Sequence, residues 1–273
     1  MWGGVLLASL LGVLSGSVVN ALADYLPMAR LAALEEAVAD STRPLPPHYP
    51  DGTVRPARAW VALLALVTGA MVSPTGARLP RRHVLVEIML AVASGWVVWR
   101  FGWNLQTVFY LLFLAIMALI TVIDLEHRLV LFVVVLPAAA LAVVESILTP
   151  EPPPVLRDAL LGGVVGFALY FVMFLGGVVF SRLSRTDEIA FGFGDVMLGI
   201  LSGLLLGWRP IFLALILTVV LGALGAVAFL VSKVVSRTGY SLFTALPYGP
   251  YIVAATLIIM FWRDAIRVWL LGG

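Results

Sequence analysis

The chain has 273 residues, of which 62% are hydrophobic and only 12% are charged, and it contains no cysteine. Because a soluble domain is typically about 25% charged and 45–50% apolar, this composition predicts an integral membrane protein rather than a soluble enzyme. The net charge of +2 gives no indication of nucleic-acid binding, and the absence of cysteine excludes disulfides, thiolate metal sites and cysteine nucleophiles.

Long apolar stretches recur along the chain, and several approach the ~20 residues that cross the hydrocarbon core of a bilayer as a helix. The stretches are continuous rather than alternating, which favours helices over a β-barrel. We therefore predict an all-α polytopic membrane protein with about eight transmembrane helices and one longer cytoplasmic loop. The predicted spans cover residues 2–23, 83–99, 105–123, 129–148, 159–180, 193–208, 210–231 and 246–262.

The first span, residues 1–23, precedes the longest polar stretch, which we predict to be a cytoplasmic loop over residues 24–83. Prolines between Pro44 and Pro50 are incompatible with regular structure. The segment Ala59–Val72 is apolar, but its length of about 14 residues is short for a span. We expect it to be a non-spanning part of the loop, and residues 84–273 to form the rest of the membrane region.

Three polar side chains in this region invite a functional interpretation. His48 and Asp51 lie in the proline-rich loop, but two candidate ligands are weak evidence for a metal site, and we predict none. Glu87 lies one turn inside the second long span, where a carboxylate is costly. A functional role and a structural ion pair with nearby arginines both remain open for Glu87.

The basic residues gather in three of the loops between spans, which orients the chain. By the positive-inside rule those loops are cytoplasmic and the N-terminus is outside. The same orientation places Asp124 and Asp195, each at the edge of a span, on the cytoplasmic side. The orienting residues are Arg78, Arg81, Arg82, Arg182, Arg185, Lys233 and Arg237.

Asp124 and Asp195 are the smallest group of residues in the chain that could catalyse a reaction. Asp195 ends a glycine-flanked run that begins at Phe191, and Asp124 follows a long span. Two carboxylates that share one proton can activate water and protonate a carbonyl oxygen. Gly192 and Gly194 would leave room for the backbone of a substrate beside such a pair.

The spacing of these aspartates alone leaves other interpretations open. Aspartate is a favoured helix cap, so Asp195 could be structural, and Arg128 could be an ion-pair partner of Asp124. A proton-coupled transporter that uses Asp124 and Asp195 as a relay is the second functional alternative. A transporter would need carboxylates spread through the depth of the membrane, whereas these two are expected at one face.

Five motifs, distributed along nearly the whole chain, resemble those of the type IV prepilin peptidases, a family of GxGD intramembrane aspartic proteases, and they occur in the same order. The strongest is Gly-Phe-Gly-Asp at 192–195, followed by Val196-Met197-Leu198, and Ile123-Asp124 resembles the family's first catalytic motif. The other three are Gly16-Ser17-Val18-Val19-Asn20 with Leu26-Pro27, then Val84-Leu85-Val86-Glu87-Ile88, and finally Leu246-Pro247-Tyr248-Gly249-Pro250-Tyr251.

The resemblance implies an endopeptidase that removes the short basic leader from prepilins or pseudopilins at the cytoplasmic face of the cell membrane. By this resemblance Asp124 and Asp195 are the catalytic dyad, residues 84–273 are the membrane peptidase core, and proteolysis needs no cofactor. The context would be the type IV pilus or type II secretion. Glu126, Asp187 and Glu188 could attract the basic leader, although they could equally be solvated loop charges.

The chain departs from the family pattern in its first loop. Family members often carry two CxxC pairs there, which hold a metal, and many also methylate the new N-terminus with S-adenosylmethionine. This chain has no cysteine, and no glycine-rich cofactor signature is visible. We therefore expect N-methyltransferase activity to be doubtful, with S-adenosylmethionine required only if that activity is retained.

Overall fold

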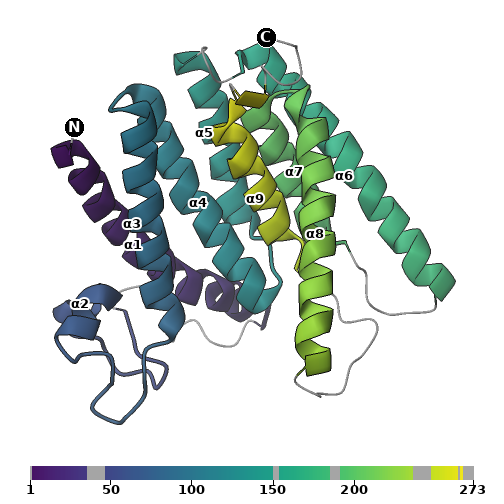
Figure 1. Ribbon diagram of the computed structural model, residues 1–273. Helices are drawn as coiled ribbons and strands as arrows, with labels where there is room; N and C mark the ends of the chain where they lie inside the picture. The colour runs from purple at the N-terminus through teal and green to yellow at the C-terminus, as the bar shows by residue number, and fades with distance from the viewer. Residues whose placement is uncertain are drawn as a thin grey trace. The chain divides into compact units, whose positions relative to one another are not determined.

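The computed structural model describes residues 2–35, 47–149, 154–184, 191–235, 247–263 and 265–266. It is 81% helical, and five of its helices are long and apolar enough to cross a membrane (Figure 1). Three shorter apolar helices, with 13 to 17 residues each, accompany them in the part of the chain that the structure describes. The predicted all-α polytopic membrane protein is confirmed.

The helices belong to two compact units, residues 1–123 and 124–273. The first unit holds α1 (Trp2–Glu35), the 3-10 helix η1 (Ala57–Ala59), α2 (Ala62–Val67), α3 (Arg81–Phe101) and most of α4 (Leu105–His127). The second unit holds the end of α4, then α5 (Phe132–Leu148), α6 (Leu156–Ser184), α7 (Phe193–Leu206), α8 (Pro210–Val235) and α9 (Gly249–Phe261).

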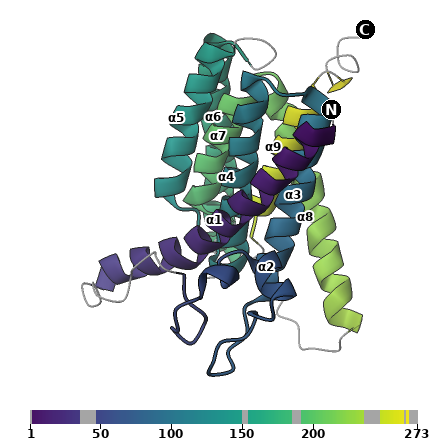
Figure 2. The same cartoon turned by 90° about the vertical axis from the view of Figure 1, so that its left-hand side faces the viewer.

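Helices α1 and α3 of the first unit lie against each other (Figure 2). Gly16 of α1 makes this close approach possible, because a Cβ atom at that position would lie 2.8 Å from the Cα atom of Glu87. In lipid, helices associate through such small residues rather than through the hydrophobic effect.

Helix α1 is longer than the predicted first span. The polar loop was expected to begin at residue 24, but the helix continues past Pro27 to Glu35. Residues 28–35 are rich in alanine and leucine, which favour a helix. In addition, the charge on Asp24 is matched by neighbouring cations, so it does not force the helix to end.

Residues 47–80 form a small folded segment below α1 and α3. Two isolated antiparallel bridges close turns within it, between His48 and Val54 and between Val72 and Arg78. The apolar stretch Ala59–Val72 contains only the six-residue helix α2, whose length of about 9 Å is far too short to span a bilayer. The segment has its own apolar cluster, made of Tyr49, Ala59, Ala62, Ala65, Ala70 and Leu79.

Glu87 holds α2 against α3. Its carboxylate oxygens accept hydrogen bonds from the backbone N–H groups of Ala62 and Leu63, at 2.7 and 2.8 Å. The side chain is only 1% exposed. These N–H groups start α2 and have no intrahelical partner. The carboxylate that the sequence marked as a functional residue or an ion-pair partner therefore caps a helix.

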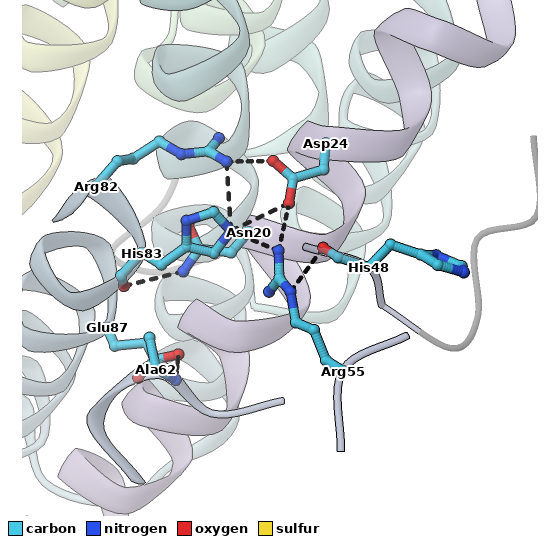
Figure 3. A network of polar contacts seen from close by, with 8 residues as sticks. All are labelled: Asn20, Asp24, His48, Arg55, Ala62, Arg82, His83 and Glu87. Carbon is cyan, nitrogen blue, oxygen red and sulfur yellow. Dashed lines mark hydrogen bonds and ion pairs between the residues drawn. The ribbon is translucent and has the colours of Figure 1, made fainter. Parts of the chain in front are cut away.

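A polar network around Asp24 connects α1, α3 and the segment 47–80 (Figure 3). Asp24 accepts from Arg55 at 3.2 Å, pairs with Arg82, and lies 3.0 Å from Nε2 of His83. Arg55, which is 5% exposed, also donates to the carbonyl oxygen of His48 at 2.7 Å. Asn20 donates to the carbonyl oxygen of His83. A buried guanidinium needs such partners, because unpaired charge is costly to bury.

Asp51 joins the two turns of the segment 47–80. Its carboxylate accepts from Thr53 of its own turn, from the Ser73 hydroxyl at 2.5 Å, and from the Thr75 hydroxyl. The hydrogen bonds from Ser73, Thr75 and Thr53 hold the pKa of Asp51 well below its usual range. Each bond favours the charged carboxylate, which alone accepts all of them.

In the second unit, α7 packs against α5, α6, α8 and α9. Its contact with α6 is made by glycines four residues apart on both helices. A Cβ atom on Gly162 would collide with the carbonyl oxygen of Gly203, and a Cβ atom on Gly203 would collide with that of Gly162. Gly166 faces the carbonyl oxygen of Gly199 in the same way. The two backbones therefore touch directly, as in other small-residue membrane interfaces.

We predict that Glu87→Ala destabilises the first unit. The variant leaves the N–H groups of Ala62 and Leu63 without their acceptor, at a cost of about 1–3 kcal/mol. Glu87→Gln keeps one carbonyl oxygen and should lose about half as much. Denaturant unfolding in detergent micelles measures both, and an alanine variant as stable as the parent would contradict the capping role.

Asp51→Asn should destabilise the segment 47–80 at neutral pH, because the amide cannot accept all the bonds that the carboxylate accepts. The folded segment holds the pKa of Asp51 below its ordinary value of 3.8. The folded state therefore binds fewer protons than the unfolded state, and this stabilisation begins to decrease as the pH falls below 3.8 and is lost fully only below the pKa of the folded state. The difference in unfolding free energy between parent and variant should shrink between neutral pH and pH 3. A difference that stays constant over this range would contradict the role of the charge.

Candidate active site

Asp195 lies in the first turn of α7, where a carboxylate is favoured. The helix begins after Gly192, whose backbone N–H donates to Oδ2 of Asp195 at 2.9 Å. This is the carboxylate half of a capping box; glycine has no side chain to supply the other half. The positive end of the helix dipole also favours a negative charge here. Asp195 is 8% exposed, so this bond is made away from bulk water.

Asp124 lies in the last turn of α4. Its Oδ2 accepts a hydrogen bond from the backbone N–H of Gly249 at 3.0 Å, although the two residues are 125 positions apart in the chain. Asp124 is 5% exposed. The helix ends three residues later at His127, and the next residue, Arg128, adopts a left-handed conformation with φ of 53° and donates its N–H to the carbonyl oxygen of Asp124.

The segment that begins α9 brings the two aspartates together. Tyr248 precedes Gly249, which binds Asp124, and the ring of Tyr248 meets that of Phe191, four residues before Asp195.

Aromatic and small residues enclose the pair. Phe191 stacks on Tyr170 with 6.0 Å between ring centroids and meets the ring of Tyr248 edge to face at 5.6 Å. Gly194 fits against Val130 of the connection after α4, because a Cβ atom at 194 would lie 2.6 Å from that of Val130. Gly192 is open, and an added Cβ atom would meet nothing closer than 3.7 Å.

The structure brings together four of the residues that the sequence singled out, namely Asp124, Asp195, Gly192 and Gly194. Glu126 is exposed in the last turn of α4. Asp187 and Glu188 lie outside the described residues. The sequence interpretation did not assign Tyr248 and Gly249 to the site, although the motif at 246–251 was the signal that could have placed them there.

The chemistry available to this site is that of two buried carboxylates. Within the described ranges, no three histidine, aspartate or glutamate side chains gather as a metal-binding group. Like charges that are buried close together cannot both ionise comfortably, so such a pair tends to hold one proton. One member can then act as a general base while the other acts as a general acid.

Comparison with known proteins relates the chain to one family. A sequence model described as the type IV leader peptidase family matches residues 111–227, a range that includes both Asp124 and Asp195. A protein of Pseudomonas aeruginosa named prepilin leader peptidase/N-methyltransferase is 31% identical over 96% of this chain and 91% of its own length.

Two further relatives carry the same name. The protein of Stutzerimonas stutzeri is 30% identical over 96% of this chain and 92% of its own length. The protein of Pseudomonas putida is 31% identical, again over 96% of this chain and 92% of its own length. No solved structure matches the chain.

We predict that Gly249→Ala destabilises the second unit, whereas Gly192→Ala is tolerated. A Cβ atom at 249 would lie 2.5 Å from Oδ2 of Asp124, while the added atom at 192 has space. Overpacking of this kind costs about 1–3 kcal/mol, and a substitution without a clash usually changes stability by less than about 0.5 kcal/mol. Thermal or denaturant unfolding in micelles compares the two variants. Equal stabilities would show that residue 249 does not lie against the carboxylate.

Proposed function

Because this chain belongs to the type IV leader peptidase family, a family of proteases, we propose that it is an intramembrane aspartic endopeptidase. Its substrates would be prepilins or pseudopilins, and the product would be the same protein without its short basic leader. The observation that carries the proposal is the buried pair Asp124 and Asp195, each held by a backbone N–H group within one compact unit.

The reaction needs one proton shared between Asp124 and Asp195. The ionised carboxylate takes a proton from water, and the resulting hydroxide attacks the carbonyl carbon of the scissile peptide. The protonated carboxyl donates its proton to the carbonyl oxygen. When the C–N bond breaks, the protonated member of the pair gives its proton to the leaving nitrogen, and the other carboxylate takes a proton from a hydroxyl group of the tetrahedral intermediate, so the dyad again holds one proton. A coupled pair titrates as a unit, so neither residue is assigned a permanent role as acid.

The leader would be recognised through its positive charge. Glu126 is exposed in the last turn of α4, two residues after Asp124, and can face a basic leader that approaches the site. Asp187 and Glu188 would contribute in the same way from the connection between α6 and α7. Under this proposal the site faces the cytoplasm, in agreement with the basic loops that the positive-inside rule places there.

The apolar helix that follows the cut would lie along α6 and α7. A groove between these helices is lined entirely by apolar side chains and a glycine, namely Leu160, Gly163, Val164, Phe167, Ile200 and Leu204. Phe174 of α6 meets Phe193 edge to face at 6.0 Å, and Phe193 stands two residues before Asp195. An apolar surface therefore leads along the two helices to the beginning of α7.

We propose that proteolysis needs no cofactor, since carboxylates and water supply every proton that moves. The relatives are named for N-methyltransferase activity as well. If this chain retains that activity, S-adenosylmethionine would be the methyl donor, and the mass of the cleaved product reports the added methyl group directly.

One observation favours the alternative of a proton-coupled transporter. The sequence predicted that Asp124 and Asp195 lie together at one face of the membrane. Glu145 of α5 is a further buried carboxylate, at 3% exposure. Its helix packs along α7 from the contact between Phe132 and Phe193 onward, so Glu145, like Arg263, lies toward the end of α7 opposite Asp195. Buried carboxylates therefore occur near both ends of α7, as a proton path would require.

We predict that Asp124→Asn and Asp195→Asn each lower leader cleavage by more than about 10³-fold, because the pair acts as a unit. Asp158→Asn is the matched control, since it removes a carboxylate from the first turn of α6 in the same unit. Co-expression with a prepilin, followed by mass spectrometry of the product N-terminus, measures the cut. Full cleavage by either Asp124→Asn or Asp195→Asn would contradict the proposal. Proton-driven uptake by proteoliposomes that depends on Asp124 would instead support the transporter.

A further inference from the structure

A second buried polar cluster lies at the end of α7 remote from Asp195. Arg263, just after α9, donates to the backbone carbonyl oxygen of Leu205 at 2.7 Å and is 8% exposed. Leu205 is ten residues beyond Asp195, so the cluster lies about 15 Å along α7 from the dyad. The last carbonyl groups of a helix lack intrahelical partners, and a cation there also matches the helix dipole.

Glu145 of α5 supplies the opposite charge. It is 3% exposed, and like Arg263 it lies toward the end of α7 remote from Asp195, because α5 packs along α7 from the contact between Phe132 and Phe193 onward. Among the described residues, its Oε1 has no hydrogen-bond partner, so its charge is not compensated by local hydrogen bonds at that atom. Ionisable side chains inside a membrane protein are costly and are rarely retained without a role. The proteolysis proposed above does not use either residue.

The same helices carry both the cluster and the proposed catalytic site. Helix α7 begins with Asp195 and ends beside Arg263, while α9 begins with Gly249 and ends beside Arg263. Between the two ends, the hydroxyl groups of Ser202 and Thr256 are 2.6 Å apart. Helices α7 and α9 are therefore joined by polar contacts in the middle and at the far end.

We propose that Arg263 and Glu145 are positioning residues that fix the register of α9 along α7. Because Gly249 holds Asp124, this register decides where Asp124 stands relative to Asp195. A shift of one residue moves a helix by about 1.5 Å, which is enough to break a 3.0 Å hydrogen bond. The inference rests on the proposed function, and it assigns the two residues no contact with substrate.

The paired variant Glu145→Gln with Arg263→Met tests this role. It removes both charges together, which avoids the uncompensated buried charge that either single change would leave. We expect kcat for leader cleavage to fall by about 10-fold or more, with KM within about twofold of the parent, because substrate contacts are unchanged. Ser146→Ala is the control, since it removes a buried hydroxyl of α5 that donates to the carbonyl oxygen of Val143 in the same helix.

A disulfide between positions 202 and 256 provides the second readout. The chain has no cysteine of its own, so Ser202→Cys with Thr256→Cys introduces one defined pair. The adjacent hydroxyl groups indicate that the geometry suits a bridge. In the paired variant Glu145→Gln with Arg263→Met, the disulfide should form more slowly than in a protein that carries only the two cysteines. Once formed, it should restore most of the lost kcat by locking the register.

Three outcomes would overturn the proposal: a parental kcat in the paired variant, a bridge that forms at the parental rate there, or a bridge that forms without restoring kcat. If the paired variant does not fold, Arg263→Lys keeps the charge but shortens the reach to Leu205, and the same three measurements apply to it. If the parent protein does not cleave leaders, the proposed function fails, while the rate of bridge formation still decides whether the cluster sets the register.

Discussion

The hydrogen bond from the backbone N–H of Gly249 to the carboxylate of Asp124 is the constraint on which the rest of the site depends. It connects the end of α4 to the beginning of α9 and places Tyr248, the neighbour of Gly249, where its ring meets that of Phe191, four residues before Asp195. The contact of Gly194 with Val130 is the second link between the end of α4 and the start of α7. With it, the start of α7, the end of α4 and the start of α9 form one arrangement inside the second unit.

The packing of the second unit gives this arrangement a rigid support. Glycines of α6 and α7 place the two backbones in direct contact, and the remaining sides of α7 meet α5, α8 and α9. A helix held by four neighbours can keep a carboxylate in its first turn away from water. The first unit shows another use of carboxylates, because Glu87 and Asp51 hold backbone and hydroxyl groups of the segment 47–80.

The sequence predicted the helical class, the family and the aspartate pair, because hydropathy and short motifs are local properties. It also suggested that Ala59–Val72 is too short to span, and the structure shows only a six-residue helix there. It missed the length of α1, since Asp24 becomes tolerable in a helix only through Arg55 and Arg82, which are distant in the chain. The roles of Glu87, Gly249 and Arg263 were inaccessible for the same reason: each depends on a partner that only the folded chain brings near.

Asp124 and Asp195 are both held by main-chain donors, from Gly249 and Gly192. A main-chain N–H survives every substitution except proline, so the holding bonds are encoded by the path of the backbone rather than by a particular side chain. Substitutions at positions 192 and 249 can change the space around the aspartates, but they rarely remove the N–H donor itself. At position 192, where an added Cβ atom has space, the bond should therefore survive most substitutions, whereas at position 249 any side chain would press on the carboxylate that the bond holds.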